Sequence, residues 1–149
     1  MDYKKILIAV DDSAYSMKAA KAGFALAHSL KAEIGIIYVV NKAKEAVSAD
    51  LLITAEQSKV VMLDEAEKTI QQFIEMYKGI ERITRFTPEG SPEQEIINIA
   101  KEWKADLIVL GTHGRSGLSR MMTGSTAEYV IRHSEIPVMV TPPEMKEKS

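Results

Sequence analysis

Short runs of consecutive apolar residues alternate along the chain with longer segments in which apolar residues recur every three or four positions. Continuous apolarity is typical of strands that are buried on both faces of a parallel sheet, and the longer period is typical of helices that cover such a sheet. The runs predict strands at residues 6–10, 34–40, 83–87, 106–110 and 137–141. The spaced segments predict helices at residues 14–30, 51–78, 92–103 and 125–133.

Strand and helix alternate from the first predicted element to the last, with no internal repeat and no long linker. This order favours an α/β fold, a doubly wound parallel sheet with helices on both faces. Ligands of such sheets lie at the carboxyl ends of the strands, where the winding direction reverses. The turns after strands one and four, at residues 11–13 and from residue 111 onward, both reach that end of the sheet.

The inner faces of the first two helices are predicted from the spacing of their small and apolar residues. Small residues let the first helix lie close on the sheet, which offsets the roughly 1 kcal/mol of helix propensity that a glycine loses. Its inner face is predicted to be Ala20, Gly23 and Ala27, with Phe24 and Leu30 beside them. The second helix carries one apolar stripe, which is predicted to be Leu63, Ala66, Ile70, Phe73 and Tyr77.

Three segments depart from this pattern. Residues 41–50 are polar and irregular and predict a loop. The strand at 83–87 is short and contains Thr84 and Arg85, a composition that fits the edge of a sheet. The charged residues 144–149 predict a frayed tail.

The bulk composition bounds the class of protein. A chain of 149 residues has the length of one domain with a real core, so we expect residues 1–149 to form a single domain. The net charge is −2 and the pI about 6.0. Binding to nucleic acid or to an anionic membrane as the main activity is therefore not expected, because both need a basic surface.

Two further sequence features concern chemistry and location. The chain contains no cysteine, which excludes disulfides, thiolate catalysis and Cys-ligated metals. Residues 1–5 lack the apolar stretch and the cleavage site of a signal peptide, and no apolar segment approaches the ~20 residues that a membrane span needs. We therefore expect a cytoplasmic protein.

The segment at 111–125 has the features of a phosphate site. It follows a buried strand, contains Gly111, Gly114 and Gly124, and enters a predicted helix. Glycine permits close backbone approach, while the start of a helix offers unpaired N–H groups and a partial positive charge. These features together favour binding of a phosphate group.

Simpler interpretations of the same residues stay open. Ser125 and Glu128 have the spacing of a capping box, so Ser125 could serve only to start a helix. The backbone N–H groups would nevertheless remain available to a ligand. Asp11 and Asp12 could form only a turn, and His113 could be only a surface loop residue.

The spacing of the glycines resembles a known signature. Gly-x2-Gly-x9-Gly-Ser, from residue 111 to residue 125, is similar to the nucleotide-binding signature of the universal stress protein family. The sequence Val-Asp-Asp-Ser at 10–13 resembles that family's strand-one ending, and the resemblance covers residues 3–141. It implies a Rossmann-like, five-stranded parallel sheet of order 3-2-1-4-5, in which the loops after strands one and four form one site.

The resemblance is to the ATP-binding branch of the family and implies a role for each matching position. Asp11 would lie near the ribose or a metal ion, the backbone of Val39 would read the adenine edge, and Gly111 would border the ribose. The phosphates would be held by Gly114, Gly124, Ser125 and Thr126. The candidate nucleotide-binding residues are Val10, Asp11, Asp12, Ser13, Val39, Gly111, Thr112, His113, Gly114, Arg115, Gly124, Ser125 and Thr126.

The implied ligand is ATP, or ADP or AMP, with Mg²⁺ or Mn²⁺ bound to its phosphates. A helix N-terminus contributes about 0.3–2 kcal/mol to an anion, whereas micromolar binding needs about 8 kcal/mol. Adenine burial and several backbone hydrogen bonds must supply the remainder. Arg115 and Arg120 could add positive charge.

Two competing functions fit the sequence less well. A phosphorelay receiver shares the acidic pair after strand one, but it needs an acceptor aspartate after the middle strand and a lysine after the last. The strands end instead at Asn41, at Thr87 and at Thr141. A nucleotide hydrolase of the P-loop type needs a lysine among the glycines, which is absent here. No catalytic residue is assigned, and at most a weak ATPase is expected.

A third competing function is a nucleotide-free interaction module. The family resemblance implies a homodimer through the strand at 136–141, since an uncovered apolar edge invites pairing with a twofold mate. The favoured interpretation is an ATP-binding stress-response module that signals by nucleotide occupancy. Its expected partners are an adenine nucleotide, a second copy of the chain and an unknown protein.

Overall fold

The computed structural model describes residues 2–41, 55–112 and 125–142. Residues 42–50 of the predicted loop, the first four residues of the predicted helix at 51–78 and the predicted tail at 144–149 lie outside these ranges. The elements follow in the order β1 (Lys5–Ala9), α1 (Ala14–Leu30), β2 (Glu33–Ile37), α3 (Ala55–Met76), β3 (Ile83–Phe86), α4 (Pro92–Trp103), β4 (Leu107–Gly111), α5 (Ser125–His133) and β5 (Val138–Thr141).

The strands form one five-stranded sheet of order β3-β2-β1-β4-β5. All four neighbouring pairs are parallel, which confirms the predicted fold class and strand order. β1 occupies the centre, where Ile6 is in register with Ile34 of β2 and with Leu107 of β4. The winding direction therefore reverses between β1 and β4, as the resemblance implies.

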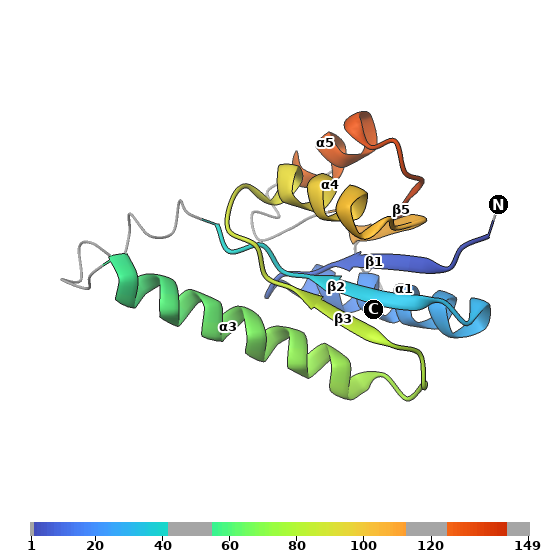
Figure 1. The fold of residues 1–149 in the computed structure, drawn as a ribbon, viewed down its shortest axis with the longest axis horizontal. Helices are drawn as coiled ribbons and strands as arrows, with labels where there is room; N and C mark the ends of the chain where they lie inside the picture. The colour runs from blue at the N-terminus through green and yellow to red at the C-terminus, as the bar shows by residue number, and fades with distance from the viewer. Residues whose placement is uncertain (1, 42–54, 113–124, 143–149) are drawn as a thin grey trace, which may run out of the picture.

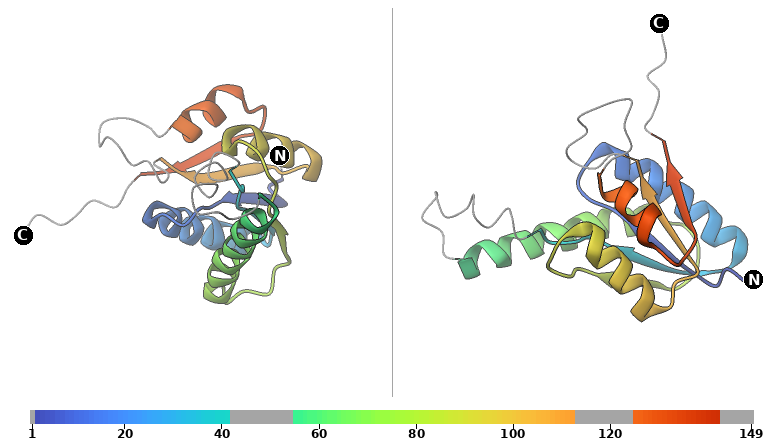
Figure 2. Two further views of the ribbon diagram at one scale, coloured as in Figure 1. Left: turned by 90° about the vertical axis from the view of Figure 1, so that its left-hand side faces the viewer. Right: turned by 90° about the horizontal axis from the view of Figure 1, so that it is seen from above.

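Helices cover both faces of the sheet. Figure 1 and the left view of Figure 2 show α4 and α5 on one face and α1 and α3 on the other. Along β1, Ile6 and Ile8 belong to the core cluster under α1 and α3, whereas Leu7 belongs to the cluster under α4 and α5. Successive side chains of a strand point to opposite faces, so an unbroken apolar run is required wherever both faces are covered.

The inner face of α1 consists mainly of small residues, as predicted. Ala20, Gly23, Phe24 and Ala27 are buried. A Cβ atom at Gly23 would lie 2.6 Å from Cδ1 of Ile8, so the glycine is required for close contact with β1. Leu30 is 45% exposed, and its assignment to the inner face was wrong. It is the last residue of α1, where the chain already turns toward β2.

The prediction of the apolar stripe of α3 is only partly right. Ala66, Ile70 and Phe73 are buried as predicted, whereas Leu63 is 41% exposed. Met62 packs against the core instead. At 3.6 residues per turn, residues 62 and 63 both have helical spacing to Ala66. The position of the sheet decides which of them faces inward.

β2 ends earlier than predicted, at Ile37 instead of residue 40. Val40 forms only an isolated parallel bridge with Glu89. Residues 38–41 therefore lie beyond β2, at the carboxyl end of the sheet and beside the end of β1. Within the described ranges, no helix combines the length and apolarity that crossing a bilayer requires.

Candidate functional site

The turn after β1 is organised by Asp11. Its Oδ1 accepts hydrogen bonds from the Ser13 N–H at 2.8 Å and from the Ser16 hydroxyl at 2.9 Å. The Ser16 Oγ in turn accepts the Asp11 N–H at 2.7 Å. Because these bonds use only one carboxylate oxygen, Asp11 forms a turn and still presents Oδ2 to its surroundings.

The backbone of Val39 lies where β1 has left the sheet. In a parallel strand, successive residues direct their N–H and C=O groups to opposite neighbouring strands. The Ile37 carbonyl accepts the Val10 N–H at 3.0 Å, and the Tyr38 N–H donates to the Phe86 carbonyl at 2.9 Å. Val39 therefore faces the β1 side, and no other described residue forms a hydrogen bond with its backbone. Its donor and acceptor are both available to a ligand.

The opposite side of the site is formed by β4 and α5. Gly111 is in register with Thr141 of β5, and the Thr112 N–H donates to the Thr141 carbonyl at 3.0 Å. α5 begins at Ser125, and the first N–H groups of a helix have no partner within it. The backbone at this end of α5 therefore offers hydrogen-bond donors.

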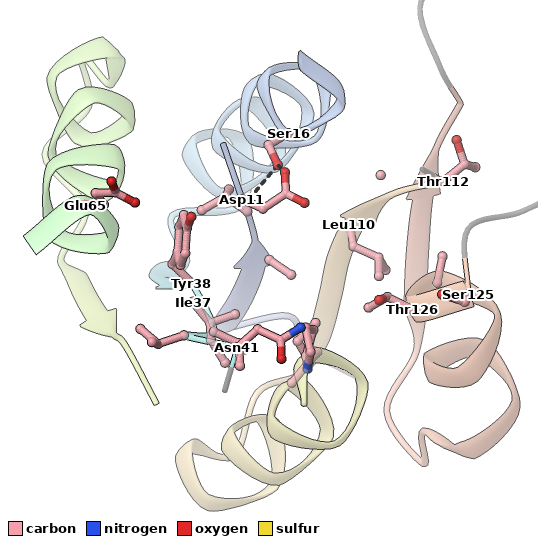
Figure 3. A pocket seen from close by; sticks show the side chains of 18 of the residues that line it. Asp11, Ser16, Ile37, Tyr38, Asn41, Glu65, Leu110, Thr112, Ser125 and Thr126 are labelled. Carbon is pink, nitrogen blue, oxygen red and sulfur yellow. Dashed lines mark hydrogen bonds between the residues drawn. The ribbon is translucent and has the colours of Figure 1, made fainter. Parts of the chain in front are cut away.

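A cavity of about 280 Å³ connects these features. It lies close to the lower end of the roughly 300–1,000 Å³ that is typical of ligand pockets. Figure 3 shows Asp11 and Ser16 on one side of it and Thr112, Ser125 and Thr126 on the other. Its apolar lining toward α4 and β4 includes Ile37, Pro92, Ile96 and Leu110. The cavity is thus apolar on one wall and polar at its ends.

The charged side chains in the described lining of the cavity are acidic. Asp11 and Glu65 line it, and none of the described lining residues is a lysine or an arginine. The partial positive charge at the N-terminus of α5 is therefore the feature in the described lining that favours an anion. An anionic group without a bound cation is therefore favoured at α5 and disfavoured near the two carboxylates.

The described side chains do not form a metal site without other ligands. No group of three or more His, Asp or Glu side chains among the described residues could hold a metal. Mg²⁺ is commonly held by one or two carboxylates together with substrate phosphates. Asp11, with Oδ2 remaining, fits an ion that is carried by the phosphates and does not form a metal site alone.

The cavity brings together most of the described candidate residues. Its lining includes Val10, Asp11, Val39, Gly111, Thr112, Ser125 and Thr126. Asp12 is exposed and Ser13 is the N-cap of α1, and neither belongs to the lining. His113, Gly114, Arg115 and Gly124, together with Arg120, lie outside the described residues.

Several lining residues were missed in the sequence. They include Ser16, Tyr38, Asn41, Met62, Glu65 and Pro92. Met62 and Glu65 are three positions apart on one helix, a spacing that places them on one face. The sequence does not show, however, that this part of α3 flanks the end of β2.

Gly111 has a structural role besides lining the cavity. A Cβ atom at this position would lie 3.2 Å from the backbone oxygen of Tyr15, in the first turn of α1. This contact is tighter than most real Cβ contacts. The glycine therefore brings β4 and α1 close together at the edge of the cavity, with or without a ligand.

A second polar cluster lies at the other end of α1. Glu81 Oε1 contacts Nδ1 of His28 at 3.0 Å and accepts a hydrogen bond from the Tyr77 hydroxyl. The Tyr77 and His28 hydrogen bonds hold the pKa of Glu81 below its ordinary value. Burial, followed by the bond to Glu81, raises the pKa of Tyr77 to about 12. This cluster joins α1 to the segment between α3 and β3.

Comparison with known sequences gives consistent matches. A sequence model of the universal stress protein family matches residues 2–142. The universal stress protein MJ0531 of Methanocaldococcus jannaschii is 38% identical over 152 residues, which cover 97% of this chain and 85% of that protein. The universal stress protein YxiE of Bacillus subtilis is 33% identical, covering 93% of this chain and 98% of that protein.

Solved structures share the fold. MJ0577 of Methanocaldococcus jannaschii superposes with a TM-score of 0.85 at 25% identity, covering 98% of this chain and all of that one. A universal stress protein in complex with cAMP superposes with a TM-score of 0.64 at 22% identity, covering 95% and 98% of the two chains. At this identity the second likeness concerns the fold alone.

Proposed function

Because the chain belongs to the universal stress protein family, we propose that its cavity binds ATP, with ADP or AMP as alternatives. The observation that carries this proposal is that one cavity contains the N-terminus of α5 and the backbone groups of Val39, which no described residue pairs. The first suits a nucleobase edge and the second suits a phosphate. Nucleotide occupancy would then serve as a signal in a stress response.

The base would bind at Val39. Adenine presents an acceptor, N1, beside a donor, the 6-amino group. The N–H and C=O of one extended residue complement this pair. Ile37, Ile96 and Leu110 provide an apolar wall for the face of the ring, and ligand pockets commonly combine such walls with a few oriented polar groups.

The phosphates would bind at α5. Ser125 and Thr126 line the cavity at the start of this helix. The motif glycines Gly114 and Gly124, outside the described residues, would complete this part of the site. Mg²⁺ or Mn²⁺ would neutralise phosphate charge when bound. Asp11 would be the carboxylate that the ion approaches.

The site supports binding better than hydrolysis. Phosphoryl transfer relies on fixed cationic groups around the transferred phosphate, and the described lining contains none. We therefore expect little or no turnover. Steady hydrolysis at about 1 per second, an ordinary enzymatic rate, would contradict this part of the proposal.

The direct test is to denature freshly purified protein and to identify released adenine nucleotide by absorbance and chromatography. Calorimetry with ATP, ADP and AMP would follow. Gly114→Val and Gly124→Val should abolish ATP binding while leaving the circular dichroism spectrum unchanged. Neither released nucleotide nor heat of binding at millimolar ATP would favour the nucleotide-free interaction module instead.

We also propose a homodimer through residues 136–141. β5 is an edge strand of the sheet, and Val138, Met139 and Val140 are only partly buried. Pairing with the β5 of a second copy would satisfy the open edge. A monomeric mass by light scattering at micromolar concentration would argue against this dimer.

A further inference from the structure

We propose that Glu65 of α3 selects nucleotides whose ribose 2′- and 3′-hydroxyl groups are both free. This inference rests on the proposed binding of an adenine nucleotide and adds a specificity-determining residue to that site. The carboxylate would accept a hydrogen bond from the ribose and would repel a phosphate placed on either hydroxyl.

Glu65 lies on a wall of the cavity that an ion pair connects to the end of the sheet. It lines the cavity together with Met62, and Figure 3 shows its side chain on α3, on the side where Asp11 and Tyr38 lie. Six residues before Glu65, Lys59 forms an ion pair of 2.7 Å with Glu89. Glu89 forms an isolated bridge with Val40, three residues beyond the end of β2. The start of α3 is thus tied to the strand end that borders the cavity.

Within the part of the chain that the structure describes, the Glu65 carboxylate has no partner. The acidic neighbours on α3 are paired, Asp64 with Lys68 at 3.0 Å and Glu67 with Arg85 at 3.4 Å. Among the described residues, no hydrogen bond or ion pair involves Glu65. An uncommitted carboxylate at a ligand cavity is available to accept hydrogen bonds from a ligand.

The distribution of charge decides which part of the nucleotide meets Glu65. The phosphates are favoured at the N-terminus of α5 and disfavoured near Glu65, whereas near Asp11 they need a divalent ion. The base edge is already complemented by Val39. The ribose remains, and the two oxygens of one carboxylate can accept hydrogen bonds from both of its neighbouring hydroxyls. Because Asp11 uses Oδ1 within the turn and its Oδ2 is assigned to the phosphate-borne ion, Glu65 is the carboxylate of the described lining that remains for the ribose.

The test compares Glu65→Ala with the matched control Asp64→Asn, which removes the adjacent charge outside the cavity. Calorimetry would use ATP, 2′,3′-dideoxy-ATP, ADP and adenosine 3′,5′-bisphosphate. Because Glu65 is exposed, solvent screens its charged hydrogen bond, and Glu65→Ala should weaken ATP binding about threefold to tenfold. The same variant should change binding of the dideoxy nucleotide less than about twofold. Asp64→Asn should leave both affinities unchanged.

Binding of adenosine 3′,5′-bisphosphate should respond to Glu65→Ala in the opposite direction from binding of ATP. The wild-type protein should bind it at least about tenfold more weakly than ADP, and Glu65→Ala should narrow this difference. ATP binding by Glu65→Ala at wild-type affinity would overturn the inference. An equal loss with ATP and the dideoxy nucleotide would also overturn it, because Glu65 would then act on the base. If the wild-type protein binds no adenine nucleotide, the proposed function itself fails.

Discussion

Replacing Val39 by proline tests the base contact at one atom. Proline removes the backbone N–H, and at Val39 no described residue accepts a hydrogen bond from that N–H. The next residue is the matched control, because the Val40 N–H donates to the Pro88 carbonyl at 2.8 Å. Val39→Pro should therefore impair ligand binding, whereas Val40→Pro should impair the fold.

The magnitudes follow from the hydrogen bonds that each change removes. A buried acceptor without a partner costs about 1–3 kcal/mol. Val39→Pro would leave adenine N1 without its donor, so ATP affinity should fall about 5- to 150-fold. Its free energy of unfolding should change by less than about 1 kcal/mol. Val40→Pro leaves the Pro88 carbonyl unpaired, and its free energy of unfolding should fall by about 1–3 kcal/mol.

The assay is calorimetric titration of each protein with ATP and with 1-deaza-ATP, which lacks the N1 acceptor. Urea denaturation of the free proteins reports stability. The loss caused by Val39→Pro should be large for ATP and small for 1-deaza-ATP. Wild-type affinity of Val39→Pro for ATP, or an equal loss with both nucleotides, would refute the assignment of the Val39 N–H to the base.

Three further predictions concern packing, the metal ion and pH. Gly23→Ala should lower the free energy of unfolding in urea by about 1–3 kcal/mol, because its Cβ would overlap Ile8; unchanged stability would contradict close packing. Chelating divalent ions should weaken binding of ATP about tenfold and leave AMP little affected, and equal effects would exclude a phosphate-borne ion. Glu81→Gln should destabilise the protein above the ordinary carboxyl pKa of 4.5. Because folding lowers this pKa, the wild-type advantage should disappear as the pH falls through the folded-state value; a constant difference would rule out the bonds to Tyr77 and His28.

The fold could be predicted from the sequence because its signals are local. The run Ile6-Leu7-Ile8 supplies side chains to both faces of β1, so the covered faces of the sheet are already visible as unbroken apolarity. The small residues of α1 likewise predict close packing on the sheet, and Gly23 does lie close against Ile8 of β1. Where two neighbouring residues both had helical spacing, as with Met62 and Leu63, the pattern alone could not choose between them.

The candidate site was predictable only in part. The glycine spacing and the acidic turn pointed to Asp11, Gly111 and Ser125, and the structure places all three at one cavity. The contributions of Met62 and Glu65 were missed, because nothing in α3 itself shows which strand end it flanks. Asp11 also shows that two interpretations can both hold, since it forms a turn and lines the cavity.

By itself, the sequence determined the order of elements, the parallel sheet and the segments that meet at its carboxyl end. These properties depend on periodicity and on short motifs, which act over a few residues. Only the tertiary structure decided that no described residue pairs with the Val39 backbone, that Glu65 lines the cavity and that Leu63 is exposed. Each depends on where β1 leaves the sheet and how α3 lies across it, and such contacts join residues far apart in the chain.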